Sequence, residues 1–217
     1  MKKAFTILEL VFVIVVVGII AAVVIPSTKT NPLEEAAVQL LSDIRYTQHL
    51  AMVDDKYDAN DDEWYRARWQ LIFYKGINAN RVPSYTVFSD NSTYTGDPSI
   101  NEIAINPLNK NLLMSGGYSG STRLNINHSN FIGTKNMNLG MRYGVKGYRL
   151  SGGCSGARIS FDHLGRPLRG DLSTMDDPYK AGTQRLIVSD CNITIQNESD
   201  SISIILNAET GYAKINF

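Results

Sequence analysis

Glu9 is the residue in this sequence whose position most clearly suggests chemistry. It is the only charged residue in the apolar run from Phe5 to Ile25, FTILELVFVIVVVGIIAAVVI. A charge in apolar surroundings is costly unless an opposite charge pairs with it. Glu9 is therefore a candidate to bind a cation that another chain supplies. The structural alternative is a charge near a helix end that extends toward water.

Cys154 and Cys191 are the only two cysteines. They form no C-x-x-C motif, which disfavours a redox or metal-binding pair. In an oxidising compartment we expect one structural disulfide between them. In the chain-entropy model it would contribute about 3 to 4 kcal/mol of stability.

A basic stretch is the second candidate for chemistry. Six cations interleave with aromatic residues, and Asp162 is the only acid among them. Basic groups bind phosphates and aromatic rings stack on bases, so the stretch could contact DNA. The alternative is an ordinary solvated surface, and the formal net charge of zero favours neither. The candidate DNA contacts are Arg142, Lys146, Arg149, Arg158, Arg166 and Arg169.

Other chemistry is not indicated. The three histidines, His49, His128 and His163, share no ligand spacing. The acidic segment from Asp54 to Glu63 lacks the glycine and the ligand order of a calcium loop. No nucleophile elbow, phosphate loop or zinc-protease motif occurs. The sequence predicts no catalytic residue, no metal and no cofactor.

The run from Phe5 to Ile25 predicts a membrane-spanning helix, because at about 1.5 Å per residue it reaches roughly 30 Å. Lys2 and Lys3 precede it, so the positive-inside rule keeps the N-terminus cytoplasmic and exports the remainder.

The first residues also carry a combined pattern: a short basic leader, an apolar helix with one acid, and then a proline. Its members are Lys2, Lys3, Ala4, Phe5, Glu9 and Pro26. This pattern resembles the signal of type IV prepilins and type II secretion pseudopilins. The resemblance implies that a prepilin peptidase cleaves between Ala4 and Phe5 and methylates the amine of Phe5. Glu9 would then accept that amine on a neighbouring subunit. Ala4 stands where the family usually has glycine.

Beyond the apolar run, Asn31, Pro32 and Glu34 predict the start of an amphipathic helix. Short runs of branched and aromatic residues, separated by turn residues, then predict strands. These runs are 68–74, 84–88, 103–105, 123–127, 158–161, 185–188, 193–195, 201–206 and 212–215.

Two further blocks narrow the resemblance. Residues 159–167, ISFDHLGRP, are similar to a signature of the GspH/FimT-type minor pilins, and Thr210-Gly211-Tyr212 is similar to their C-terminal ending. The resemblance implies an α+β, pilin-like fold. In it a long N-terminal helix, with a transmembrane half and an amphipathic half, packs on an antiparallel β-sheet domain.

The expected organisation has four parts. Residues 1–4 form a leader peptide, 5–25 the transmembrane half of the helix, 26–53 its amphipathic half, and 54–217 a periplasmic β-rich globular domain. We expect a single-pass inner-membrane protein with a cytoplasmic N-terminus and a periplasmic C-terminal domain, which assembly moves into a periplasmic or extracellular filament.

The expected function is that of a non-enzymatic minor pilin or pseudopilin. The subunit would assemble into a type IV pilus or a type II secretion pseudopilus and support protein secretion or filament initiation. The alternative is a DNA-binding minor pilin of a competence filament. The expected partners are prepilin peptidase, other pilin or pseudopilin subunits, an inner-membrane assembly platform, inner-membrane lipid and, in the alternative, DNA.

Overall fold

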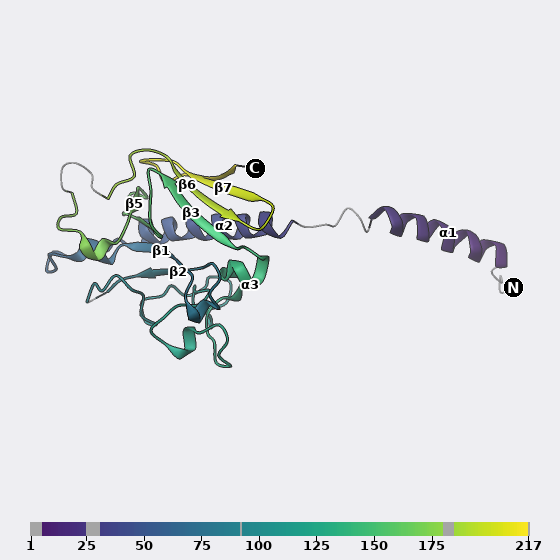
Figure 1. Ribbon diagram of the computed structural model, residues 1–217, viewed down its shortest axis with the longest axis horizontal. Helices are drawn as coiled ribbons and strands as arrows, with labels where there is room; N and C mark the ends of the chain where they lie inside the picture. Colours follow the sequence, from purple (N-terminus) through teal and green to yellow (C-terminus); the bar gives the residue numbers. More distant parts are fainter. Residues whose placement is uncertain (1–5, 25–30, 92, 180–184, 217) are drawn as a thin grey trace. The chain divides into compact units, whose positions relative to one another are not determined.

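The computed structural model describes residues 6–24, 31–91, 93–179 and 185–216. The chain divides into two compact units, Met1–Asn31 and Pro32–Phe217 (Figure 1). The predictions for Lys2, Lys3, Ala4, Phe5 and Pro26 lie outside the described residues.

The first unit holds one helix, α1 (Ile7–Val24), of 18 residues. Over the described ranges of the chain, no helix combines the length and the apolar character needed to cross a membrane. This finding overturns the predicted transmembrane half and the predicted single-pass location in the inner membrane.

The second unit begins with α2 (Pro32–Val53). Its buried side chains recur at helical spacing, as the sequence predicted, and include Leu33, Ala37, Leu40 and Ile44. Glu34 and Glu35 lie in the first turn, where the positive end of the helix dipole favours acidic groups. The amphipathic prediction for this helix is confirmed.

The first sheet has the strand order β2-β1-β4-β5. Its strands are β1 (Trp69–Tyr74), β2 (Ser84–Ser89), β4 (Arg158–Phe161) and β5 (Pro167–Arg169). All neighbours are antiparallel. β1 and β2 are consecutive in the chain, whereas β4 joins them across a separation of more than eighty residues, with Leu71 opposite Ile159.

The second sheet has the order β3-β6-β7-β8 and is also antiparallel. Its strands are β3 (Gly147–Gly152), β6 (Cys191–Gln196), β7 (Ser201–Leu206) and β8 (Ala213–Asn216). Shorter elements lie before and between the strands of the two sheets. They are α3 (Leu139–Tyr143), η2 (Trp64–Ala67), η3 (Ile77–Ala79), η4 (Thr122–Leu124), η5 (Lys135–Met137) and η6 (Leu172–Thr174).

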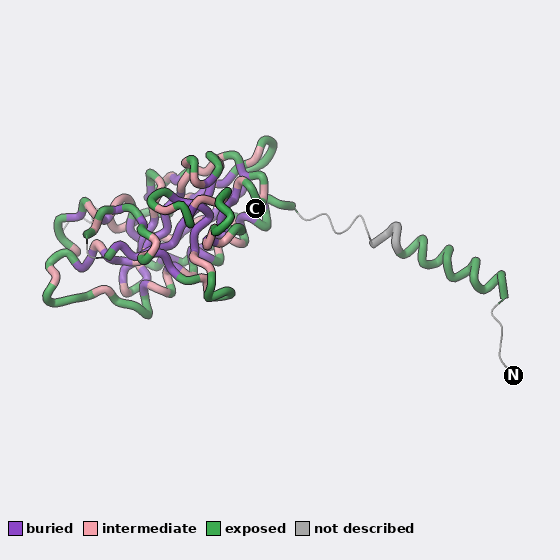
Figure 2. The backbone as a smooth tube through the Cα atoms, turned by 90° about the horizontal axis from the view of Figure 1, so that it is seen from below, coloured by how far each residue is buried: buried purple, intermediate pink, exposed green. Residues whose placement is uncertain are grey.

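Both sheets pack on α2, which contacts β1 and β4 of the first and β6, β7 and β8 of the second. The buried side chains of all three layers form one hydrophobic core. Figure 2 shows the buried residues in purple in the interior of this unit. A smaller cluster, made of Trp64, Tyr65, Leu168, Leu172 and Met175, lies beside β5. Leu168 and Met175 of this smaller cluster also line a cavity.

The predicted fold class is wrong in two respects. The N-terminal region is not one long helix, because α1 ends at Val24, α2 begins at Pro32, and they belong to different units. Pro26 lies between them and Pro32 is the first residue of α2, and proline lacks the amide hydrogen that a continuous helix needs. The β-rich part is two antiparallel sheets rather than one, because α2 buries side chains against both.

Several strand predictions are confirmed, namely those that correspond to β1, β2, β4, β6, β7 and β8. The predicted strand at 123–127 is wrong, because η4 occupies its start. Segments 103–105 and 185–188 form only isolated bridges. The sequence predicted neither β3 nor β5, and Pro167 is the first residue of β5.

The predicted disulfide between Cys154 and Cys191 is confirmed. Cys191 begins β6, and Cys154 lies in the connection from β3 to β4. The bond therefore joins that connection to the central strands of the second sheet, and both cysteines are buried.

Candidate functional site

The surface of α1 is apolar and exposed along its described length. Ile7 and Leu8 are each 83% exposed, and Phe12 is 72% exposed. The residues from Ile7 to Ile20 are all exposed, and this helix is accordingly green in Figure 2. A contiguous apolar surface of this size marks an interaction site. Burying each Val, Leu or Ile fully would contribute roughly 1.5 to 3 kcal/mol.

Glu9 lies in the first turn of α1 and forms a capping box with Thr6. The backbone amide of Thr6 donates to Glu9 Oε2 at 3.3 Å, and the Thr6 hydroxyl donates to the same oxygen at 3.2 Å. The amide of Glu9 donates to Thr6 Oγ1 at 3.3 Å. The sequence signal for this motif, Thr-x-x-Glu, was present but missed. Glu9 therefore stabilises the first turn of α1 and also carries a negative charge there.

The carboxylate of Glu9 keeps a free acceptor. Both hydrogen bonds from Thr6 use Oε2, and no residue that the structure describes donates to Oε1. The carboxylate is also near the positive end of the helix dipole, which stabilises it. Chemically, the site can accept a further hydrogen bond from a cation at the beginning of an apolar helix.

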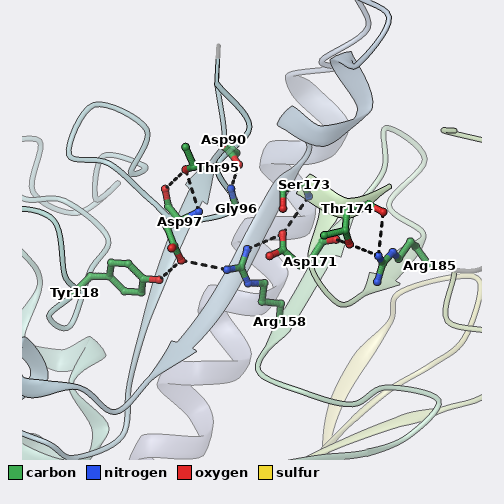
Figure 3. A network of polar contacts seen from close by, with 10 residues as sticks. All are labelled: Asp90, Thr95, Gly96, Asp97, Tyr118, Arg158, Asp171, Ser173, Thr174 and Arg185. Carbon is green, nitrogen blue, oxygen red and sulfur yellow. Dashed lines mark hydrogen bonds and ion pairs between the residues drawn. The ribbon is translucent and has the colours of Figure 1, made fainter. Parts of the chain in front are cut away.

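Arg158, one of the candidate DNA contacts, is occupied by acidic partners within the chain. Its guanidinium lies 3.2 Å from Asp171 Oδ1 and 3.3 Å from Asp97 Oδ1, and Figure 3 shows it between these two carboxylates. Tyr118 also donates to Asp97 Oδ1, at 2.8 Å. Burial raises the pKa of Tyr118, and its hydrogen bond to Asp97 adds to that rise. Arg158 therefore joins the loop at Asp97 to η6.

Two more of the basic candidates are paired in the same way. Arg166 Nε donates to Asp162 Oδ2 at 2.7 Å, and Asp162 is buried. Lys146 Nζ lies 3.3 Å from Glu198 Oε1 on an exposed surface, where such a pair contributes little. These pairs reduce the positive charge that the stretch could offer to phosphates.

The remaining candidates, Arg142, Arg149 and Arg169, are exposed. They belong to α3, to β3 and to β5, so they are distributed over both sheets. Contact with DNA through the six residues stays a prediction.

The described histidines belong to no group of candidate metal ligands. His49 is exposed on α2, and His128 Nδ1 accepts a hydrogen bond from the amide of Asn130 at 3.1 Å. Within the described ranges, no group of three or more His, Cys, Asp or Glu side chains could hold a metal ion.

Comparisons of the chain with protein-family models, with curated proteins and with solved structures found no match.

Proposed function

We propose that this protein is a minor pilin or pseudopilin. In this proposal prepilin peptidase cleaves between Ala4 and Phe5, and the mature subunit assembles through α1 into a type IV pilus or a type II secretion pseudopilus. Its role is protein secretion or filament initiation. The observation that carries the proposal is α1 itself, whose side chains from Ile7 to Ile20 are all exposed.

The occupant that fits α1 is the corresponding apolar helix of another subunit. An apolar surface of Val, Ile, Leu and Phe is covered best by a second apolar surface, because their contact removes both surfaces from water. Gly18 also supports close packing, since a Cβ atom at this position would meet, beyond the backbone of its own helix, no described atom within 4 Å. A glycine with open space beside it lets a second helix approach closely.

Glu9 supplies specificity in this packing. Cleavage after Ala4 would create a new amine at Phe5, and an amine on a neighbouring subunit is the cation that the Glu9 carboxylate would accept. Among apolar helices a single ion pair is formed in one axial register, because any other leaves both charges unpaired. The pair would therefore set the position of each incoming subunit.

The test separates the charge of Glu9 from its capping role. Glu9→Gln removes the charge but keeps a residue type that completes a capping box, whereas Thr6→Ala removes the cap and keeps the charge. Each variant is expressed with the filament machinery, and its amount in sheared filaments is measured by immunoblot. We expect Glu9→Gln to reduce incorporation at least roughly tenfold, as one lost charged pair implies, and Thr6→Ala to be incorporated.

Incorporation of Glu9→Gln at the wild-type level would contradict the proposed ion pair. A mature protein that still begins at Met1, detected by mass spectrometry of intact protein, would contradict the proposed processing.

A further inference from the structure

A cavity of about 160 Å³ lies beside β5 and the smaller hydrophobic cluster. Three arginines line it: Arg68, which precedes β1, Arg166, which precedes β5, and Arg185. Apolar side chains, including Leu168 and Met175, form part of the wall. Segments far apart in the sequence thus bring cations together around one apolar space.

Arg68 is the unusual member of this group. It is only 4% exposed, and its Nε hydrogen-bonds to no residue that the structure describes. Its guanidinium carbon lies 5.1 Å from the centre of the Trp64 ring, which gives it a face to stack on. Burial lowers the pKa of Arg68, against the opposing effect of Asp162. A buried cation with an unused donor is stabilised when an anion reaches it.

Asp162, a buried carboxylate that also lines the cavity, already has other partners. Asp162 accepts hydrogen bonds from Arg166 Nε at 2.7 Å and from the backbone amides of Leu164 and Arg166 at 3.0 and 2.9 Å. Arg166 and Asp162 therefore neutralise each other, and Asp162 has little capacity left for Arg68.

The other charges differ in exposure. Arg185 donates to the hydroxyl of Thr174, a bond drawn in Figure 3, and carries no carboxylate partner in the described part of the chain. Asp176 and Asp177 are exposed, so water screens their charges. Among the described residues, Arg68 and Arg185 are therefore the arginines of this cavity that form no direct ion pair with a carboxylate.

We propose that this cavity binds the carboxylate of a ligand with a small apolar body, with Arg68 as its principal cation. A planar guanidinium matches a carboxylate through two parallel hydrogen bonds. Leu168, Met175 and Tyr179 offer apolar contact to the body of the ligand. A single negative charge suits the site better than a phosphate dianion, because three aspartates also line the cavity. The carboxylate belongs either to a free small acid or to the C-terminus of a peptide.

The experiment measures binding to the full chain by isothermal titration calorimetry and by the shift in unfolding temperature. The probes are benzoate, its neutral analogue benzamide, inorganic phosphate and N-acetylphenylalanine, which mimics a peptide C-terminus. We expect benzoate to bind and to raise the unfolding temperature, and benzamide and phosphate to bind at least tenfold more weakly. Tighter binding of N-acetylphenylalanine than of benzoate identifies the peptide source, and weaker binding identifies the free acid.

Arg68→Gln tests the assignment, and Arg149→Gln is the matched control, an exposed arginine in the second sheet. We expect Arg68→Gln to weaken benzoate binding at least tenfold and Arg149→Gln to leave it unchanged. Equal binding of benzoate and benzamide, wild-type affinity in Arg68→Gln, or no binding of either carboxylate would overturn the proposal.

Arg185→Gln provides a second test at a less buried position, should Arg68→Gln fail to fold. A several-fold loss of benzoate affinity in this variant supports the site, and an unchanged affinity overturns it. None of these measurements depends on filament assembly, so their failure is distinguishable from failure of the proposed function.

Discussion

The Thr6 hydroxyl and the Glu9 carboxylate close the first turn of α1 through hydrogen bonds of 3.2 to 3.3 Å. The Glu9 carboxylate therefore caps α1 in addition to carrying its charge. Experiments have to separate these two roles.

Thr6→Ala should loosen the start of α1. A lost N-cap costs about 1 kcal/mol, which corresponds to roughly fivefold faster opening of the first turn. Hydrogen exchange of the amides of Thr6 and Glu9 in the full chain would measure it, with the amides of α2 as the internal reference. Unchanged exchange of the first-turn amides would show that the capping box does not stabilise α1.

Replacing both Cys154 and Cys191 by alanine should lower the free energy of unfolding by about 3 kcal/mol, because the disulfide closes a long loop in the unfolded chain. Denaturant titration measures this difference. The reductant dithiothreitol is the control. It should destabilise the wild type by a similar amount and leave the double variant unaffected, and equal sensitivity of both proteins would refute the assignment.

Asp90→Asn should change how stability depends on pH. Burial raises the pKa of Asp90 to about 6, although the amide of Gly96 donates to it at 2.6 Å. The ordinary value is about 3.9. Between these values the folded state binds more protons than the unfolded state. The contribution of Asp90 to the free energy of unfolding is therefore complete below about pH 4 and is lost as the pH rises through about 6.

The asparagine variant carries no charge at this position, so its stability should fall less steeply between about pH 4 and 6. At neutral pH it should be more stable than the wild type by about 1 to 3 kcal/mol, because one unit of pKa difference corresponds to about 1.4 kcal/mol. Denaturant titrations across this range measure both effects. The pKa of Asp43 is also raised by burial, so Asp43 contributes to the pH dependence of stability in both proteins. An identical slope in both proteins would refute the role of Asp90.

Tyr85→Phe should destabilise the junction of α2 and the first sheet. The Tyr85 hydroxyl is buried and donates to Asp43 Oδ2 at 2.6 Å. Its removal leaves Gln39 Nε2, at 3.0 Å, as the remaining side-chain donor to that oxygen. The expected loss is about 1 to 3 kcal/mol, measured by denaturant titration. Tyr212→Phe, at an exposed ring, should change stability little, and equal stability of Tyr85→Phe and wild type would be inconsistent with this view.

The sequence predicted well those elements in which buried side chains recur at a regular spacing along the chain. In α2 the spacing of Leu33, Ala37, Leu40 and Ile44 is enough to identify the buried face. In β7 the alternation of Ile202, Ile204 and Leu206 with more exposed residues does the same. These patterns are local, so they can be recognised without knowing what covers them.

The parts that could not be predicted depend on contacts between distant segments. β3 contains Gly147, Arg149 and Gly152, residues that do not favour strands, and pairing with β6 holds it in place. The cavity that Arg68, Arg166 and Arg185 line is formed by residues from position 68 to position 186. No spacing along the chain signals such a site. The capping box of Glu9, by contrast, could have been recognised.

The central claim, that α1 is covered by the N-terminal helix of another subunit, is tested most directly by photo-cross-linking in intact filaments. A benzoylphenylalanine at Val13, on the exposed surface of α1, is compared with the same group at Ile77 in the globular unit. We predict that mass spectrometry of the Val13 product identifies the apolar N-terminal helix of a neighbouring subunit and that Ile77 gives no such product. A Val13 product confined to the globular unit of the same chain, or the absence of any product with another subunit, would contradict the account.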